Sequence, residues 1–286
     1  MGIGDYFRSV ETMTAEQVRE YVDTHKPDMY NLVDVRQPAE YRQMHLPGAQ
    51  LIPLPDLPGR LKDLDPAKPT IAYCQSGMRS RAAASVLETA GFKTVSSMAG
   101  GIKAWRGHVA AGPPEAGMAF FTEAADADDL IALAWLLEEG SRKFYSAVAE
   151  MITQPDAAAF FNTLVKAEEK HKGSLEALYR EITGKEPGTG FPRGLAAAEG
   201  AGDRMEGNLS ISKALAWAKG KDLTELLELS MALETDSFDL YIKMGRIVPG
   251  ENSRRVFARL VAEEKEHLAR MAGLFDKYIT RGPTER

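Results

Sequence analysis

The pattern of apolar and polar residues changes about a third of the way along the chain. Up to about residue 107, short apolar and β-branched runs alternate with helical patterns and with turns rich in proline and glycine. Four of these runs are predicted strands, at residues 31–35, 50–54, 70–74 and 94–98, and a helical pattern covers residues 80–91. Strands that alternate with helices indicate an α/β fold built on a parallel sheet.

Beyond residue 126 every strong pattern is helical. Apolar residues recur every three or four positions over four long stretches, predicted as helices at residues 126–152, 156–183, 222–247 and 252–280. The second and third helices are separated by a long connection, residues 184–221, which is rich in glycine at first and then holds one short amphipathic helix near residues 209–218. Four helices with a single long crossover indicate an all-α four-helix bundle.

The two halves are joined by a segment without periodicity. The sequence AAGPPEAG, residues 110–117, contains two adjacent prolines and is predicted to be a linker. We therefore divide the chain into an α/β domain at residues 1–108, a linker at 109–125 and a helical domain at 126–286.

The helical half contains an internal repeat of polar residues. Pairs of identical residues are each 96 positions apart: Glu138 and Glu234, Tyr145 and Tyr241, Glu168 and Glu264, His171 and His267. In the second helix the apolar seam, in steps of three and four, runs through Phe161, Leu164, Glu168, His171, Leu175 and Leu178. The fourth helix repeats this seam with Phe257, Leu260, Glu264, His267, Met271 and Leu274. With Glu138 and Glu234 on the equivalent seams, four carboxylates and two imidazoles are predicted to face the core.

Ionised carboxylates in an apolar core require cations nearby, because an unpaired charge in a protein interior is prohibitively costly. Four carboxylates balance the formal charge of two divalent metals, and carboxylate and imidazole ligands suit such metals. The alternative is a buried network of glutamates with arginine or lysine, but the seams carry no basic residue at this height. The pattern therefore favours a two-metal centre.

The doubled Glu and Glu-x-x-His pattern resembles the erythrin part of the rubrerythrin and ferritin-like di-iron superfamily, over nearly all of residues 126–280. The resemblance implies two iron ions, with manganese as the alternative, held by Glu138, Glu168, His171, Glu234, Glu264 and His267. Glu168 and Glu264 would bridge the metals, and Tyr145 and Tyr241 would support the ligands.

Cys74, the only cysteine, lies in a loop between a predicted strand and a predicted helix. Backbone N–H groups and the helix dipole point into such a loop and lower the pKa of a thiol there. Gly77 permits tight curvature, and Arg79 adds a fixed positive charge. The other interpretation of a single cysteine is a small buried apolar side chain, which the polar loop disfavours.

Three stretches resemble the rhodanese superfamily: VDVRQPAEYRQMHLPGA from Val33, the CxxGxR loop from Cys74, and GGIKAW from Gly100. The resemblance covers about residues 10–107 and implies that Cys74 accepts a sulfane sulfur as a persulfide. It makes Cys74 and Arg79 the catalytic residues, with a sulfur- and anion-binding loop formed by Gln75, Ser76, Gly77 and Met78. The loops around the site would be organised by Asp34, Arg36 and Glu40.

Composition limits the partners and the compartment. The net charge is −6 and the basic residues are scattered, which argues against nucleic acid or an anionic membrane surface as a partner. The longest apolar run, residues 130–137, is too short to cross a bilayer, and the first residues lack a targeting pattern, so we expect a cytoplasmic protein. One cysteine excludes an internal disulfide and a four-cysteine iron–sulfur or rubredoxin site within one chain.

Two functions fit these patterns. The first is a sulfurtransferase coupled to a di-iron oxidoreductase centre that acts on oxygen, peroxide or a sulfur species, with the Cys74 persulfide as its reductant or substrate. The second is a metal-binding or redox-sensing bundle whose rhodanese-like domain delivers sulfur or docks a partner. The implied partners are a sulfane-sulfur donor, a thiol acceptor and an unknown electron donor, with a homodimer as one arrangement.

The sequence departs from the rubrerythrin pattern in two places. Ser237 stands where rubrerythrins carry a further glutamate ligand, and their rubredoxin tail is absent.

Overall fold

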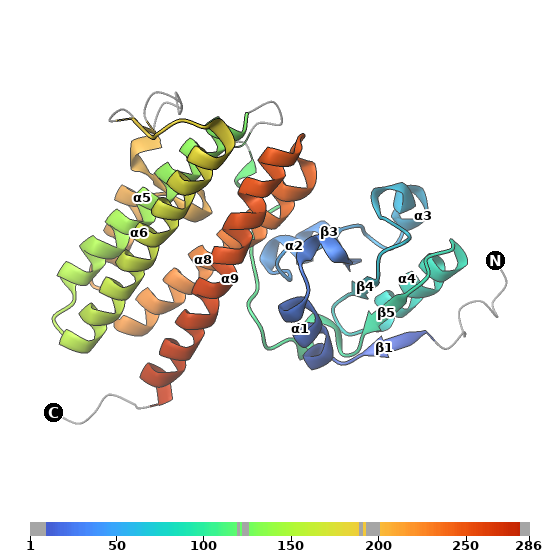
Figure 1. Ribbon diagram of the computed structural model, residues 1–286. Helices are drawn as coiled ribbons and strands as arrows, with labels where there is room; N and C mark the ends of the chain where they lie inside the picture. The colour runs from blue at the N-terminus through green and yellow to red at the C-terminus, as the bar shows by residue number, and fades with distance from the viewer. Residues whose placement is uncertain (1–9, 119–120, 122–125, 189–190, 193–200, 281–286) are drawn as a thin grey trace. The chain divides into compact units, whose positions relative to one another are not determined.

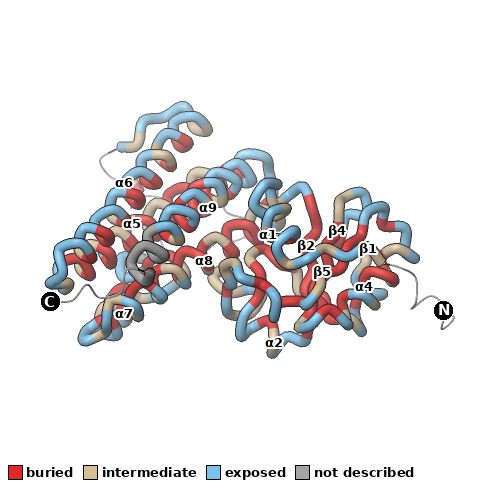
Figure 2. Tube along the Cα trace, turned by 90° about the horizontal axis from the view of Figure 1, so that it is seen from below, coloured by how far each residue is buried: buried red, intermediate tan, exposed pale blue. Residues whose placement is uncertain are grey.

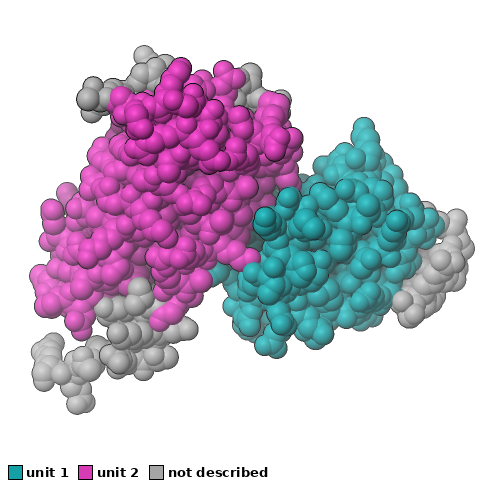
Figure 3. Space-filling model, in the orientation of Figure 1, with its two compact units in different colours: residues 1–116 teal, residues 117–286 magenta. Residues whose placement is uncertain are grey.

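The structure, a computed structural model, describes residues 10–118, 121, 126–188, 191–192 and 201–280. At residues 201, 208 and 274–280 it describes the backbone alone, so the predicted seam position Leu274 lies outside the described side chains. The chain forms two compact units, Met1–Ala116 and Gly117–Arg286, which Figure 3 shows in different colours. Their boundary falls inside the predicted linker, of which residues 119–120 and 122–125 lie outside the described residues.

The first unit is built on a parallel sheet of five strands in the order β1-β5-β4-β2-β3 (Figure 1). The strands are β1 (Glu11–Met13), β2 (Asn31–Asp34), β3 (Gln50–Leu51), β4 (Thr70–Tyr73) and β5 (Val95–Met98). Each of the four predicted runs contains a strand, so the parallel α/β fold is confirmed. β1 was not predicted, because it is a three-residue strand with two exposed positions and no apolar run.

Helices cover both faces of the sheet, which explains why β2, β4 and β5 are buried along their whole length. The helices are α1 (Ala15–Thr24), α2 (Pro38–Gln43), α3 (Leu57–Arg60) and α4 (Met78–Thr89), with short 3-10 turns η2 (Pro27–Met29), η3 (Leu61–Asp63) and η4 (Gly101–Ala104). Successive strand residues point to opposite faces. Val33 therefore belongs to the same apolar cluster as Ala83 of α4, whereas Leu32 clusters with Val18 of α1 and Tyr41 of α2.

The second unit is largely helical and contains four long helices (Figure 1). They are α5 (Ala127–Met151), α6 (Pro155–Thr183), α8 (Leu223–Ile247) and α9 (Glu251–Thr280), and each begins and ends within one residue of its prediction. α5 packs along α6, α8 packs along α9, and α9 also contacts α5 and α6. Buried residues form a stripe along one side of these helices, as Figure 2 shows.

The ends of the long helices carry recognisable sequence signals. α6 begins with Pro155, which suits the first helical position because proline lacks an N–H. At the start of α8, Asp222 and Glu225 each accept a hydrogen bond from the other's backbone N–H, which forms a capping box. Among the described residues, none of the helices combines the length and the apolar character needed to span a bilayer.

The described part of the connection between α6 and α8 packs on α5. It contains η6 (Ala201–Asp203), β6 (Arg204–Met205), η7 (Glu206–Asn208), β7 (Leu209–Ser210) and α7 (Ile211–Ala218). α7 matches the short helix predicted near residues 209–218, whereas the antiparallel pair of β6 and β7 was not predicted. Met205 is fully buried in an apolar cluster with Phe144 and Tyr145 of α5. The connection is therefore part of the core of this unit.

Candidate functional sites

Cys74 directly follows β4 and begins the loop that leads into α4. Its side chain is 1% exposed, and the Sγ atom accepts a hydrogen bond from the Gly77 N–H at 3.1 Å. Gly77 has a φ of 97°, a left-handed conformation that glycine adopts without strain. Burial raises the pKa of the Cys74 thiol, but hydrogen bonds from Ser80, Ser76 and Gly77 outweigh burial and bring that pKa below its ordinary value. The loop therefore stabilises the thiolate relative to the thiol.

The glycines of the GGIKAW stretch let a second backbone segment support this loop. The Ile102 N–H donates to the Cys74 carbonyl oxygen at 2.8 Å, and the Lys103 N–H donates to the Gln75 carbonyl oxygen at 3.3 Å. Gly101 has a φ of 57°, and a Cβ atom there would lie 2.3 Å from the Cys74 carbonyl oxygen. The close approach of the two segments therefore requires glycine at this position.

Arg79, the predicted positive charge of the loop, is paired with a carboxylate. Its Nη1 donates to Glu40 Oε2 at 2.7 Å and its Nη2 donates to Glu40 Oε1 at 2.8 Å, which is a bidentate ion pair. The hydrogen bonds from Arg79 lower the pKa of Glu40 to about 2. Both side chains are partly exposed. The positive charge of Arg79 is thus largely compensated before any anionic donor arrives.

A second ion pair, between Arg36 and Asp34, links β2 to the loop. Both side chains are buried, and Arg36 Nη2 lies 2.6 Å from Asp34 Oδ2. The same nitrogen donates to the Met44 carbonyl oxygen at 2.6 Å, and Nη1 donates to Gln75 Oε1 at 3.4 Å. Arg36 therefore helps to position Gln75. The remaining side chains predicted for the loop, Ser76 and Met78, are exposed to solvent.

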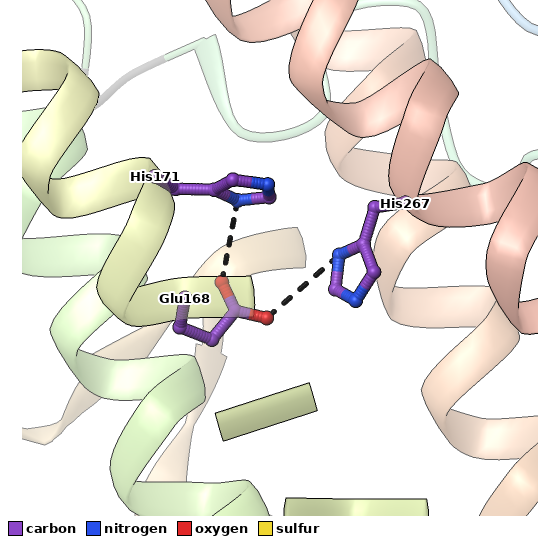
Figure 4. A group of neighbouring side chains, drawn as sticks. All are labelled: Glu168, His171 and His267. Carbon is purple, nitrogen blue, oxygen red and sulfur yellow. Dashed lines mark ion pairs between the residues drawn. The ribbon is translucent and has the colours of Figure 1, made fainter. Parts of the chain in front are cut away.

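All six predicted metal ligands meet in the interior of the helical unit. None is more than 4% exposed: Glu138, Glu168, His171, Glu234, Glu264 and His267. His171 Nδ1 lies 3.1 Å from Glu138 Oε2 and 3.5 Å from Glu168 Oε2. His267 Nδ1 lies 3.0 Å from Glu234 Oε2 and 3.8 Å from Glu168 Oε1. Figure 4 shows the Glu168 carboxylate with one oxygen toward each imidazole.

The potential ligand atoms are close enough together to share cations. The described residues contain four groups of three side chains in which each side chain has one potential ligand atom within 4.8 Å of a ligand atom of the other two. The groups are Glu168, His171 and His267; Glu138, His171 and Glu264; Glu234, Glu264 and His267; and Glu138, Glu168 and Glu206. Several of these buried atoms form no hydrogen bond of suitable geometry among the described residues, although His267 Nδ1 lies 3.0 Å from Glu234 Oε2. They are Glu138 Oε1, both oxygens of Glu168 and Glu264, Glu234 Oε2 and both ring nitrogens of His267. Buried polar atoms normally have partners, so this donor set fits bound cations.

Electrostatics oppose the ionised forms of Glu168 and Glu264 when no cation is nearby. Burial raises the pKa of Glu168 and Glu264 well above the ordinary value, and neighbouring carboxylates raise it further. Burial lowers the pKa of His171, but Glu138 and Glu168 more than offset this and raise it to about 12. Metal ligands must be ionised glutamates and neutral imidazoles. Divalent cations would favour those protonation states.

The two predicted tyrosine partners form different hydrogen bonds. The Tyr145 hydroxyl donates to Glu234, a predicted ligand. The Tyr241 hydroxyl donates to Glu206 Oε1 at 3.0 Å. Glu206 is 1% exposed, and it was not predicted as a site residue. It lies before α7 in the connection between α6 and α8, in a stretch with no helical period and no counterpart in the repeat, so neither signal pointed to it.

Comparison with known proteins identifies the first unit. Residues 14–108 match the model of a family described as rhodanese-like domain. The uncharacterized protein YqhL of Bacillus subtilis is 35% identical over 104 residues, which cover 36% of this chain and 79% of that protein. A sulfurtransferase of Allochromatium vinosum is 38% identical over 77 residues, which cover 27% of this chain and 72% of that protein. The chain therefore belongs to the rhodanese-like family.

A rhodanese-like domain protein from Staphylococcus aureus is 27% identical, and the match covers 34% of this chain and 92% of that protein with a TM-score of 0.32. The family match ends at residue 108, before the first helix of the second unit begins at Ala127.

Proposed function

We propose that this protein is a rhodanese-type sulfurtransferase, with Cys74 as its persulfide carrier, joined to a ferritin-like, rubrerythrin-like four-helix bundle that holds a di-iron centre. A loop that stabilises the thiolate and relatives named as sulfurtransferases support the first part. The second part rests on one observation, the buried cluster of carboxylate and imidazole atoms that lack hydrogen-bond partners. The two activities would belong to separate domains at residues 1–108 and 126–286.

In the first part, the Cys74 thiolate attacks the sulfane sulfur of a donor. A bond forms between Cys74 Sγ and this sulfur while the bond from the sulfur to the rest of the donor breaks, and the donor leaves with the electron pair. The thiolate of an acceptor then attacks the outer sulfur, and Cys74 leaves as a thiolate again. The N–H groups of the loop stabilise negative charge on Sγ before and after transfer. The cycle therefore needs no external oxidant or reductant.

In the second part, two iron ions, or manganese, would be held by Glu138, Glu168, His171, Glu234, Glu264 and His267. One glutamate from each of two helices and Glu-x-x-His from each of the other two is the ligand set of ferritin-like di-iron and di-manganese proteins. The metals would supply redox chemistry toward oxygen, peroxide or a sulfur species. Tyr145 fixes the Glu234 carboxylate through its hydrogen bond, and the apolar cluster around Phe161 limits access of water.

Metal analysis of protein purified without oxygen tests the metal centre. We expect two ions of iron or manganese per chain, and fewer in Glu168→Ala or Glu264→Ala, because each removes a buried carboxylate that would hold the metals. Glu266→Ala is the matched control, since Glu266 is an exposed glutamate on the same helix as Glu264. Wild-type protein that binds no more metal than a variant with all six ligands replaced would exclude the centre.

Turnover distinguishes an oxidoreductase from a metal-binding or redox-sensing module. An oxidoreductase loaded with iron consumes peroxide or oxygen catalytically when an electron donor or a persulfide is supplied. A sensor changes its oxidation state once per chain and then stops. Iron-loaded wild-type protein that performs a single turnover under all these conditions would favour the sensing role, with the rhodanese-like domain delivering sulfur or docking a partner.

A further inference from the structure

Glu206 is a buried glutamate that belongs to none of the four long helices. It lies in η7, in the connection between α6 and α8, and only 1% of its surface is exposed. One of its carboxylate oxygens lies within 4.8 Å of ligand atoms from Glu138 and Glu168. A fifth carboxylate thus enters a cluster that already contains four, which is unfavourable in a protein interior unless cations compensate the charge.

Two hydroxyl groups hold the Glu206 carboxylate. The Ser141 Oγ donates to Oε2 at 3.1 Å, and the Tyr241 hydroxyl donates to Oε1 at 3.0 Å. The Ser141 Oγ also accepts a hydrogen bond from the Glu206 backbone N–H at 3.3 Å. A carboxylate has about four acceptor positions, so these two hydrogen bonds orient the side chain and leave lone pairs available.

The segment that carries Glu206 is hydrogen-bonded to both halves of the repeat. The Gly207 N–H donates to Ser237 Oγ at 3.0 Å. Ser141 and Ser237 are 96 positions apart, the same offset as the predicted ligands, and each follows a predicted ligand by three residues. Gly140 allows the backbone of Arg204 to lie close to α5, because a Cβ atom at residue 140 would lie 2.0 Å from the Arg204 carbonyl oxygen. Ser141 of α5 and Ser237 of α8 therefore both hold the backbone of the connection next to the cluster.

Glu206 breaks the symmetry of the cluster. The two imidazoles follow the repeat, since His171 lies next to Glu138 and His267 lies next to Glu234 at nearly equal distances. The tyrosines do not follow it. Among the described residues, Tyr145 donates to Glu234, whereas its equivalent Tyr241 donates to Glu206 and not to Glu138. Among the described residues, the ligand atoms of Glu206 group with those of Glu138 and Glu168, and not with those of Glu234 or His267.

We infer that Glu206 is a seventh protein ligand of the metal pair and that it makes the two metal positions inequivalent. This inference rests on the proposed two-metal centre. Glu206 extends the set of ligands beyond the four long helices, and the position near Glu138 and Glu168 becomes richer in carboxylate. Both of those glutamates have oxygens without hydrogen-bond partners, which are available to the same cation. The packing of the connection on α5 determines the position of the Glu206 carboxylate.

Titration of the metal-free, full-length protein with Co²⁺ in the absence of oxygen tests the inference. Equilibrium dialysis counts the bound ions, and the visible absorption of Co²⁺ reports its coordination. We expect two ions in the wild type, and in Glu206→Gln one ion bound as before and one bound at least about 10-fold more weakly, with a changed spectrum. The control is Glu263→Gln, which removes a buried negative charge next to Glu264 that belongs to none of the four groups.

A second variant keeps every ligand in place. Gly140→Ala forces the Arg204 backbone away from α5, so it should weaken the same Co²⁺ ion as Glu206→Gln does. It also decides the question if Glu206→Gln does not fold, with circular dichroism as the check on folding. Two Co²⁺ ions with unchanged affinity and spectrum in both folded variants would overturn the role of Glu206 alone. A wild-type protein that binds no Co²⁺ would overturn the metal centre and this role together.

Discussion

Replacing Gly101 by alanine should damage sulfur transfer without removing any reacting group. A Cβ atom at this position would lie 2.3 Å from the Cys74 carbonyl oxygen, whereas ordinary contacts begin at 3.4 Å. The two backbone segments must therefore separate by about 1.1 Å, the difference between these distances. This shift lengthens the 2.8 Å hydrogen bond from the Ile102 N–H to Cys74 and displaces the loop that holds the thiol.

Two effects contribute to the expected loss of stability. Alanine in a left-handed conformation costs about 1–2 kcal/mol, and an overpacked contact costs about 1–3 kcal/mol. We expect the free energy of unfolding to fall by about 2–5 kcal/mol, the sum of the two. Gly91→Ala is the matched control, because Gly91 has a φ of 91° and nothing lies within 4 Å of a Cβ atom there. It carries the backbone strain without the clash.

Urea unfolding and a sulfur-transfer assay with cyanide measure both consequences. Gly101→Ala should transfer sulfur about 10- to 100-fold more slowly than the wild type, since displacement of a reacting group by about 1 Å has effects of this size. Gly91→Ala should keep the wild-type rate and lose less stability. If the two variants lose the same stability and both keep the wild-type rate, the close approach at Gly101 does not hold the thiol in place.

Three further predictions concern the same loop. Cys74→Ser should abolish sulfur transfer to cyanide or a thiol while the metal content stays the same, and undiminished transfer would remove Cys74 from the reaction. Arg79→Ala should raise the KM for an anionic donor while the thiol remains open to alkylation, because the rim of the loop loses a positive charge and Glu40 loses its partner. An unchanged KM would remove Arg79 from the site. Pairing with Arg79 lowers the pKa of Glu40 from an ordinary 4.5 to about 2, so the stability that the ion pair contributes is present above about pH 4.5 and is lost as the pH falls toward 2. The difference in urea midpoint between wild type and Glu40→Gln should therefore shrink over this range, and a difference that stays constant would contradict the pKa assignment.

Periodic features of the sequence were sufficient to predict most of the fold. The apolar stripes of the four long helices must be buried, and their spacing identified each helix to within one residue. The repeat at a fixed offset brought together six residues that the structure places in one buried cluster. Local chemistry was enough for the loop at Cys74, since a strand, a glycine and a helix start follow one another within a few residues.

Features that depend on contacts between distant segments could not be predicted from the sequence in this way. Arg79 pairs with Glu40, which is 39 residues away, and neither position has a pattern that reveals its partner. Glu206 lies in a connection whose conformation is set by packing on α5 and not by its own periodicity. Gly140 was the sequence feature that indicated this packing, because a glycine on the buried face of a long helix indicates close approach of another backbone.

A persulfide on Cys74 and two metals in the helical unit can be counted on the same molecules by native mass spectrometry. The full-length protein is treated with a sulfane-sulfur donor and then with ferrous iron in the absence of oxygen. We expect a species with one added sulfur and two added irons; the sulfur is lost in Cys74→Ser, and the irons are lost when the six glutamate and histidine ligands are replaced. Added sulfur that survives Cys74→Ser, or iron that survives the replacement of all six ligands, would contradict the assignment of these two sites.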